Sequence, residues 1–254
     1  MKLFSKNICY VPQDLSSITQ SKDEVAPELG GMTEKNVSKI WESIEKLYRT
    51  GNHPLISVCI RRQGEIILNR SLGYASGNSA DGLAENAVIA NPDTPVCLFS
   101  ASKMITAMLV HMLDETGEIN LLDPISHYIP EYAQNGKRRA TIFHLLSHRG
   151  GIPRIEMEVT PELLFDKDQI LQHLYAAKPI SPAGAHLAYH AVTAGYILGE
   201  LIERVTGQDI RQFLHEKIEK PMGMNYFNFG LKPEYRDQVA LNYPTGIHPK
   251  LGTD

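Results

Sequence analysis

The segment Phe99–Lys103 places a serine and a lysine three residues apart at the start of a long apolar run. That run, Met104–Leu113, predicts a helix whose first turn holds Ser100 and Lys103. Residues three apart on a helix are neighbours, so the Lys103 amine can take the proton of the Ser100 hydroxyl. The free amides of a first helical turn also favour negative charge beside Ser100. The segment therefore predicts a nucleophile and a base on one helix face.

A second Ser-x-x-Lys, at Ser43 and Lys46, serves as an internal comparison. It falls inside an amphipathic pattern, so Ser43 is expected in mid-helix, where no backbone amide is free. Only the Ser100 copy has the setting that nucleophilic catalysis needs. The alternative for Ser100 is a helix cap, with Lys103 extended along an apolar surface.

Length and charge limit the function classes. The chain has 254 residues, of which 43% are apolar, enough to bury a full core. A net charge of -4 without long charged runs gives no basic stripe for nucleic acid and no polybasic membrane patch. No segment approaches a membrane-spanning length, and no apolar signal region follows the N-terminus. We expect a small-molecule substrate, with no nucleic-acid partner and no membrane span.

The cysteines are odd in number, widely spaced and free of Cys-x-x-Cys, at Cys9, Cys59 and Cys97. This pattern predicts reduced thiols and a cytoplasmic location, and it gives no zinc site.

His144 and His148 lie four residues apart, a spacing that holds a metal when a third ligand and an intervening Glu are present. Two leucines fill the intervening positions here. We therefore expect a packing or capping role, with His148 at a helix C-terminus. No metal and no cofactor are predicted.

The N-terminal part of the chain predicts a small sheet. Residues 1–32 read as an irregular arm, after which Thr33 caps a first helix and a single domain occupies residues 33–254. Leu55–Ile60 and Glu65–Asn69 are β-rich runs around a glycine turn and predict a hairpin. Residues 73–95 are rich in Gly, Ala, Asn and Asp, which predicts a surface connection.

Helical patterns dominate the remainder. They follow Ser100 up to Gly117, cover Thr141–His148, run from Val192 to Gly207, and cover Ile210–Ile218. No convincing strand pair follows. A hairpin needs further strands or a covering helix, so we expect an unpaired sheet edge that promotes self-association.

Tyr189 follows a turn cluster and precedes a predicted helix. A tyrosine in such a loop often packs its ring and bonds its hydroxyl. Beside a Ser–Lys pair, however, a phenol whose pKa is lowered by the ammonium can relay the proton of the nucleophile to the leaving group.

Together these motifs resemble the serine-hydrolase superfamily that contains class C β-lactamases, D,D-peptidases and related esterases. The resemblance runs from Val37 to Met224. It is carried by the hairpin and by the segments Phe99–Lys103, Leu121–Ile125, Thr141–Pro153 and Tyr189–Tyr196.

The resemblance implies an α/β fold of the penicillin-binding/β-lactamase type. An antiparallel sheet flanked by helices would face a helical lobe, with the active site between them. Ser100 would be the acylated nucleophile, Lys103 its general base or proton-holding partner, and Tyr189 the acid and base of the second motif. That motif is usually Tyr-x-Asn, and Ala191 stands at the Asn position. Loss of this amide favours the esterase-like branch and disfavours β-lactams.

The family's third motif, Lys-Thr-Gly or a relative, has no acceptable copy, since Lys250–Gly252 matches only at the level of chance. The resemblance thus predicts a chain that is incomplete at the C-terminus, lacks the C-terminal strands and has little activity. The favoured hypothesis is a serine hydrolase that forms an acyl-enzyme with ester or amide substrates. The alternatives are a catalytically incompetent homologue that acts only by binding, and a β-lactamase or D,D-peptidase.

Overall fold

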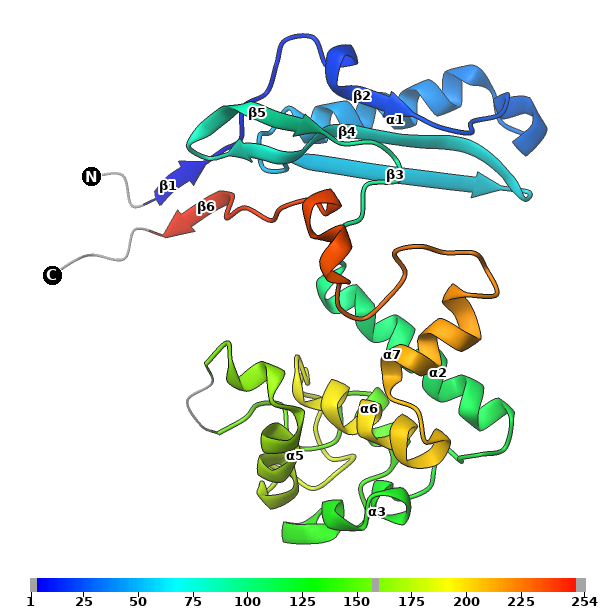
Figure 1. The fold of residues 1–254 in the computed structure, drawn as a ribbon, viewed down its shortest axis with the longest axis vertical. Helices are drawn as coiled ribbons and strands as arrows, with labels where there is room; N and C mark the ends of the chain where they lie inside the picture. The colour runs from blue at the N-terminus through cyan, green and yellow to red at the C-terminus, as the bar shows by residue number, and fades with distance from the viewer. Residues whose placement is uncertain (1–3, 157–159, 250–254) are drawn as a thin grey trace, which may run out of the picture. The chain divides into compact units, whose positions relative to one another are not determined.

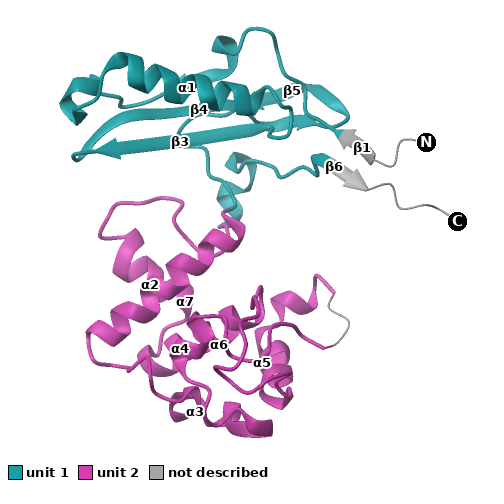
Figure 2. Ribbon diagram, turned by 180° about the vertical axis from the view of Figure 1, so that it is seen from behind, with its two compact units in different colours: residues 1–97, 232–254 teal, residues 98–231 magenta. Residues whose placement is uncertain are grey.

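The computed structural model describes residues 4–156 and 160–249. The chain divides into two compact units, one formed by residues 1–97 with 232–254 and one by residues 98–231 (Figure 2). The first carries the β-strands, and the second is helical. The predicted division into an arm and a domain at residue 33 stays a prediction.

The predicted hairpin is present as β3 (Leu55–Arg62) and β4 (Glu65–Ser79), which pair antiparallel. Strand β4 is the centre of the sheet. The short strand β2 (Thr19–Ser21), from the segment predicted to be irregular, pairs with its other side, and β5 (Gly82–Ile89) pairs with its C-terminal half. Within the described chain β3 has no partner on its outer edge, and self-association through that edge stays a prediction.

Strand β5 occupies the region predicted to be a surface connection, so that prediction was wrong. The glycines that suggested a loop instead bend β4 and let other groups approach it. Gly73 has φ 114°, and a Cβ there would lie 2.3 Å from the Pro54 carbonyl oxygen. Gly77 has φ 82°, and the β4–β5 register shifts on both sides of Ser76. Here glycine marks β-bulges within a strand pair and not its end.

Helix α1 (Glu34–Tyr48) lies along the sheet (Figure 1). Thr33 caps it as predicted, with its side-chain oxygen accepting a hydrogen bond from the Asn36 amide at 3.3 Å. The helix contributes Val37, Trp41 and Tyr48 to a buried cluster with the sheet. This helix therefore supplies the covering layer that a small antiparallel sheet requires.

A second, two-stranded sheet pairs β1 (Phe4–Asn7) antiparallel with β6 (Gly246–Pro249). No sequence pattern predicted β6. Four residues that end in proline carry no alternating pattern, and the pairing partner lies at the other end of the chain.

The helical unit holds α2 (Ser102–Glu115), α3 (Ile125–Tyr128), α4 (Ile142–Leu146), α5 (Lys167–Ala176), α6 (Thr193–Thr206) and α7 (Ile210–Leu214). A π-helical turn (His215–Glu219) continues α7. Helix α6 ends at Gly207 in the left-handed conformation, as predicted. In the described parts of the chain, no helix combines the length and apolar character needed to cross a bilayer.

A buried lysine holds the C-terminal end of α5. Lys137 is 1% exposed, and its Nζ donates to the carbonyl oxygens of Tyr175 at 2.9 Å and Ala177 at 2.5 Å. Asn135 Nδ2 donates to the Ala176 oxygen between them at 2.6 Å. The last carbonyls of a helix lack intrahelical donors, so these two side chains complete the end of α5.

We predict that Lys137→Met lowers the free energy of unfolding by about 1–3 kcal/mol, because it leaves buried carbonyls without donors. Urea denaturation followed by circular dichroism measures the effect. Lys178→Met, an exposed lysine just beyond the same helix, is the control and should change stability little. Equal stability of the two variants would show that the Lys137 bonds contribute nothing.

Candidate active site

The three predicted catalytic side chains meet in the helical unit. Ser100 lies in a 3-10 turn (Phe99–Ala101), Lys103 in the first turn of α2, and Tyr189 in the loop before α6. Lys103 Nζ donates to Ser100 Oγ at 3.3 Å, and Tyr189 OH donates to the same oxygen at 2.7 Å. One hydroxyl therefore contacts two proton-transfer groups from separate parts of the chain. The roles of the three residues in catalysis stay predictions.

The serine lies just before the α-helix and not in its first α-turn, because α2 begins at Ser102. Phe99, the residue that precedes Ser100, has φ 47° and is largely exposed. A bulky side chain in the left-handed region is an outlier that costs on the order of 1–3 kcal/mol. Strain of this kind clusters at functional sites, and here it lies directly beside the predicted nucleophile.

The environment of Tyr189 favours its ionised form. The hydrogen bond with Ser100 lowers the pKa of the phenol, and Lys103 lowers it further through hydrogen bonding and charge. Lys103 Nζ also lies 5.1 Å from the centre of the Tyr189 ring. A phenol with a lowered pKa is suited to accept and return a proton.

A small apolar cavity of about 60 Å³ adjoins Lys103 and His148. Its walls come from three helices and include Thr106, Leu145, Leu146, Ala194 and Leu198. Apolar walls strengthen electrostatic interactions beside them, so the Lys103 ammonium acts on its neighbours with less screening than in water.

The two histidines of the sequence pair have different partners. Helix α4 ends at Leu146, which leaves His144 inside the helix and His148 beyond it. His144 Nδ1 accepts from the Thr141 amide at 3.2 Å and completes a capping box, which confirms a capping role for this residue. The ring of His148 instead lies edge-on to Tyr189, with centres 4.9 Å apart. No sequence pattern predicted that His148 would contact Tyr189.

The second Ser-x-x-Lys is structural. Ser43 lies within α1, and its hydroxyl donates to the Lys39 carbonyl oxygen at 2.9 Å. This is the mid-helix setting that the sequence predicted, and it separates Ser43 from Ser100.

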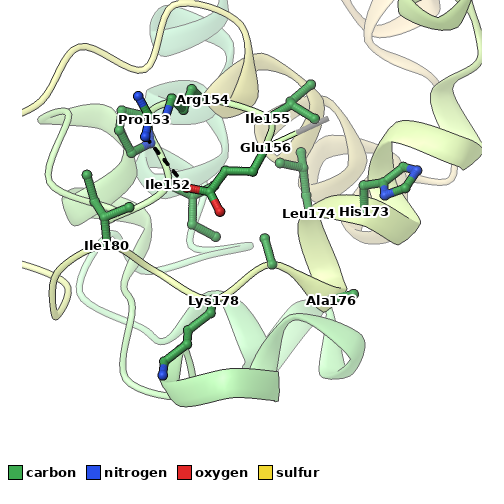
Figure 3. Close-up of a pocket in the computed structure, with 11 residues that line it drawn as sticks. Ile152, Pro153, Arg154, Ile155, Glu156, His173, Leu174, Ala176, Lys178 and Ile180 are labelled. Carbon is green, nitrogen blue, oxygen red and sulfur yellow. Dashed lines mark ion pairs between the residues drawn. The ribbon is translucent and has the colours of Figure 1, made fainter. Parts of the chain in front are cut away.

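A larger pocket of about 240 Å³ lies elsewhere in the helical unit (Figure 3). It is lined by residues 152–156 and by the C-terminal part of α5, and at its rim Arg154 and Glu156 form an ion pair of 3.8 Å. None of the three predicted catalytic residues lines it. The volume of this pocket does not by itself indicate a ligand or a reaction.

We predict that Lys103→Met raises the pKa of Tyr189 towards the ordinary value of 10.0, because it removes the nearby ammonium. The rate of acylation by an activated ester should fall by about 10²–10⁴-fold. Titration of ¹³Cζ-labelled tyrosine by NMR gives the pKa, with Tyr189→Phe identifying the signal. Ser102→Ala, which alters the other hydroxyl of the motif, is the control. An unchanged phenol pKa in the Lys103 variant would contradict the prediction.

A serine contacted by a lysine one turn along and by a tyrosine from a distant loop is the arrangement that the resemblance to the serine-hydrolase superfamily implied. Residues 35–252 match the Beta-lactamase family, and the chain belongs to that family.

Known relatives include enzymes of more than one activity. The chain is 31% identical over 141 residues to Esterase/beta-lactamase LipL of Mycobacterium tuberculosis, covering 56% of this chain and 32% of that protein. It is 27% identical over 236 residues to a putative D-alanyl-D-alanine carboxypeptidase of Escherichia coli, covering 86% and 54%. A solved family VIII carboxylesterase superposes with a TM-score of 0.72 at 29% identity, covering 80% of this chain and 54% of that one. The predicted fold class is thus confirmed, and the chain spans about half or less of the length of these relatives.

Proposed function

We propose that this chain is a serine hydrolase that acts on small esters through an acyl-enzyme. The observation that carries the proposal is the position of Ser100 Oγ, within hydrogen-bonding distance of both Lys103 Nζ and Tyr189 OH. The relatives named as an esterase/β-lactamase and a carboxylesterase support the same class of reaction.

The proposed reaction has two halves. Ser100 Oγ attacks the ester carbonyl carbon while its proton passes to the Lys103–Tyr189 pair, and a C–O bond forms as the carbonyl becomes an oxyanion. Collapse of this intermediate breaks the bond to the alkoxide, which takes a proton from Tyr189. Water then attacks the acyl-serine, gives its proton to the same pair, and the acid leaves as Ser100 recovers its hydrogen.

The oxyanion needs preorganised donors. In the proposal, the backbone amide of Ser100 supplies one of them, as expected for an amide at the start of a helix. The motif that supplies a second donor in the family has no match in the described ranges, and the chance-level match at Lys250–Gly252 lies outside them. Removing one donor typically costs about 10²–10³-fold in kcat.

The preference for esters over β-lactams rests on Ala191. This residue is exposed and stands where the family resemblance places the Asn of Tyr-x-Asn. A methyl group neither donates nor accepts, so it offers nothing to the acylamino group of a β-lactam. A simple ester has no such group and loses nothing by the change.

We predict that a fluorophosphonate labels Ser100 and no other serine. Ser100→Ala should abolish the label, while Ser102→Ala and Ser43→Ala should keep it, because only Ser100 contacts both proton-transfer groups. Peptide mass spectrometry locates the adduct. A label that survives in Ser100→Ala would refute the assignment, and absence of any label on the folded protein would favour the binding-only alternative.

We further predict that Ala191→Asn raises the ratio of kcat/KM for nitrocefin to that for p-nitrophenyl butyrate by about tenfold, the value of one added hydrogen bond of about 1.4 kcal/mol. Both substrates are followed by absorbance, and Ala191→Leu, which is close to asparagine in size but cannot hydrogen-bond, is the control. A wild-type preference for nitrocefin would show that the chain is a β-lactamase and not an esterase.

A further inference from the structure

His148 makes hydrogen bonds to the residues on both sides of Tyr189. Its carbonyl oxygen accepts from the Ala188 amide at 3.0 Å, and its Nδ1 accepts from the His190 amide at 3.2 Å. The His148 ring also lies edge-on to the Tyr189 ring. A single residue thus fixes the backbone before and after Tyr189 and contacts the ring between them.

The backbone of His148 suits this double role. It has φ 59°, in the left-handed region where His, Asn and Asp are enriched among residues other than glycine. Two residues further on, position 150 has room only for glycine, since a Cβ at Gly150 would lie 2.9 Å from Leu145 and 3.2 Å from His190 Nε2. The turn from His148 to Gly150 is therefore shaped by its contact with the loop that carries Tyr189.

His190 also holds the loop that carries Tyr189, and it is buried, with 1% of its surface exposed. His190 Nε2 accepts from the Ile152 amide at 3.2 Å, so its Nδ1 carries the proton and donates to the Ala188 oxygen at 2.6 Å. The two imidazoles are stacked, with centres 5.9 Å apart. The backbone around Tyr189 is therefore held at Ala188 and at His190, and His148 takes part at both points.

These contacts require a neutral His148 with its proton on Nε2, because only an unprotonated Nδ1 can accept from the His190 amide. Burial lowers the pKa of His148 below its usual value, and the charge of Lys103 lowers it further. The surroundings therefore favour the form of the ring that makes the contact.

We propose that His148 is a positioning residue that holds the Tyr189 phenol on Ser100 Oγ. Tyr189 is 53% exposed, so contacts to its side chain alone do not fix its position. The 2.7 Å contact to Ser100 thus depends on the backbone that His148 holds. The effect on turnover rests on the function proposed above, whereas the effect on the position of Tyr189 does not.

The test compares His148→Asn with His148→Gly. Asparagine tolerates the left-handed backbone and places its Oδ1 near the position of Nδ1, whereas glycine keeps the backbone conformation and removes both acceptor and ring. In His148→Gly the pKa of Tyr189, read from ¹³Cζ-tyrosine NMR, should rise towards 10.0. The value of kcat should fall by about 10- to 100-fold with little change in KM, as expected for a misplaced catalytic group.

His148→Asn should recover most of both losses. Equal behaviour of the Asn and Gly variants, or an unchanged Tyr189 pKa in His148→Gly, would overturn the proposal. Thermal unfolding checks that each variant is folded, and His148→Gln, whose acceptor lies one carbon further out, replaces the glycine variant if that one does not fold. Failure of the wild-type chain to react with esters or phosphonates would refute the proposed function alone, because the Tyr189 pKa still reports its position.

Discussion

The packing of α2 with α6 sets the distance on which the site depends. Ser100 and Lys103 belong to one local turn, so their contact follows from helix geometry. Tyr189 is 89 residues away from Ser100 in sequence. It reaches Ser100 because apolar residues of both helices, including Leu109, Leu113, Ile197 and Leu201, share one buried cluster. A change of packing in that cluster would reach the chemistry, since a displacement of about 1 Å can cost about 10²-fold in rate.

Local signals in the sequence predicted local structure well. The cap at Thr33, the hairpin around Gly64 and the end of α6 at Gly207 each depend on one or two residues and their neighbours, and each is present. Helix α5 was missed although its signal was available. Asp166 caps it by accepting from the Gln169 amide at 2.9 Å, but the apolar pattern that follows is weak. The glycine-rich β4–β5 pair was missed because a composition typical of loops also serves bulged strands.

The site shows the same limit. The spacing of Ser100 and Lys103 was enough to predict their pairing, whereas the role predicted for Tyr189 depended on that pair and on the family resemblance. His148 was expected at a helix C-terminus beside His144, since both fit one helical pattern. The helix stops at Leu146 instead, and two residues beyond it the chain takes a left-handed turn. Partners some forty residues away then decide what His148 does, and no local pattern encodes them.

The order of the two units along the chain has a consequence for biosynthesis. The helical unit is one continuous stretch, residues 98–231, whereas the sheet unit is built from both ends of the chain. In the sheet unit the Leu241 amide donates to the Ala75 oxygen at 2.7 Å, and Tyr243 OH accepts from the Gly77 amide at 2.8 Å. The ribosome makes all of residues 98–231 before it makes Leu241 and Tyr243. The helical unit can therefore begin to fold during translation, while the sheet unit stays incomplete until residues 232–249 have been made and join it.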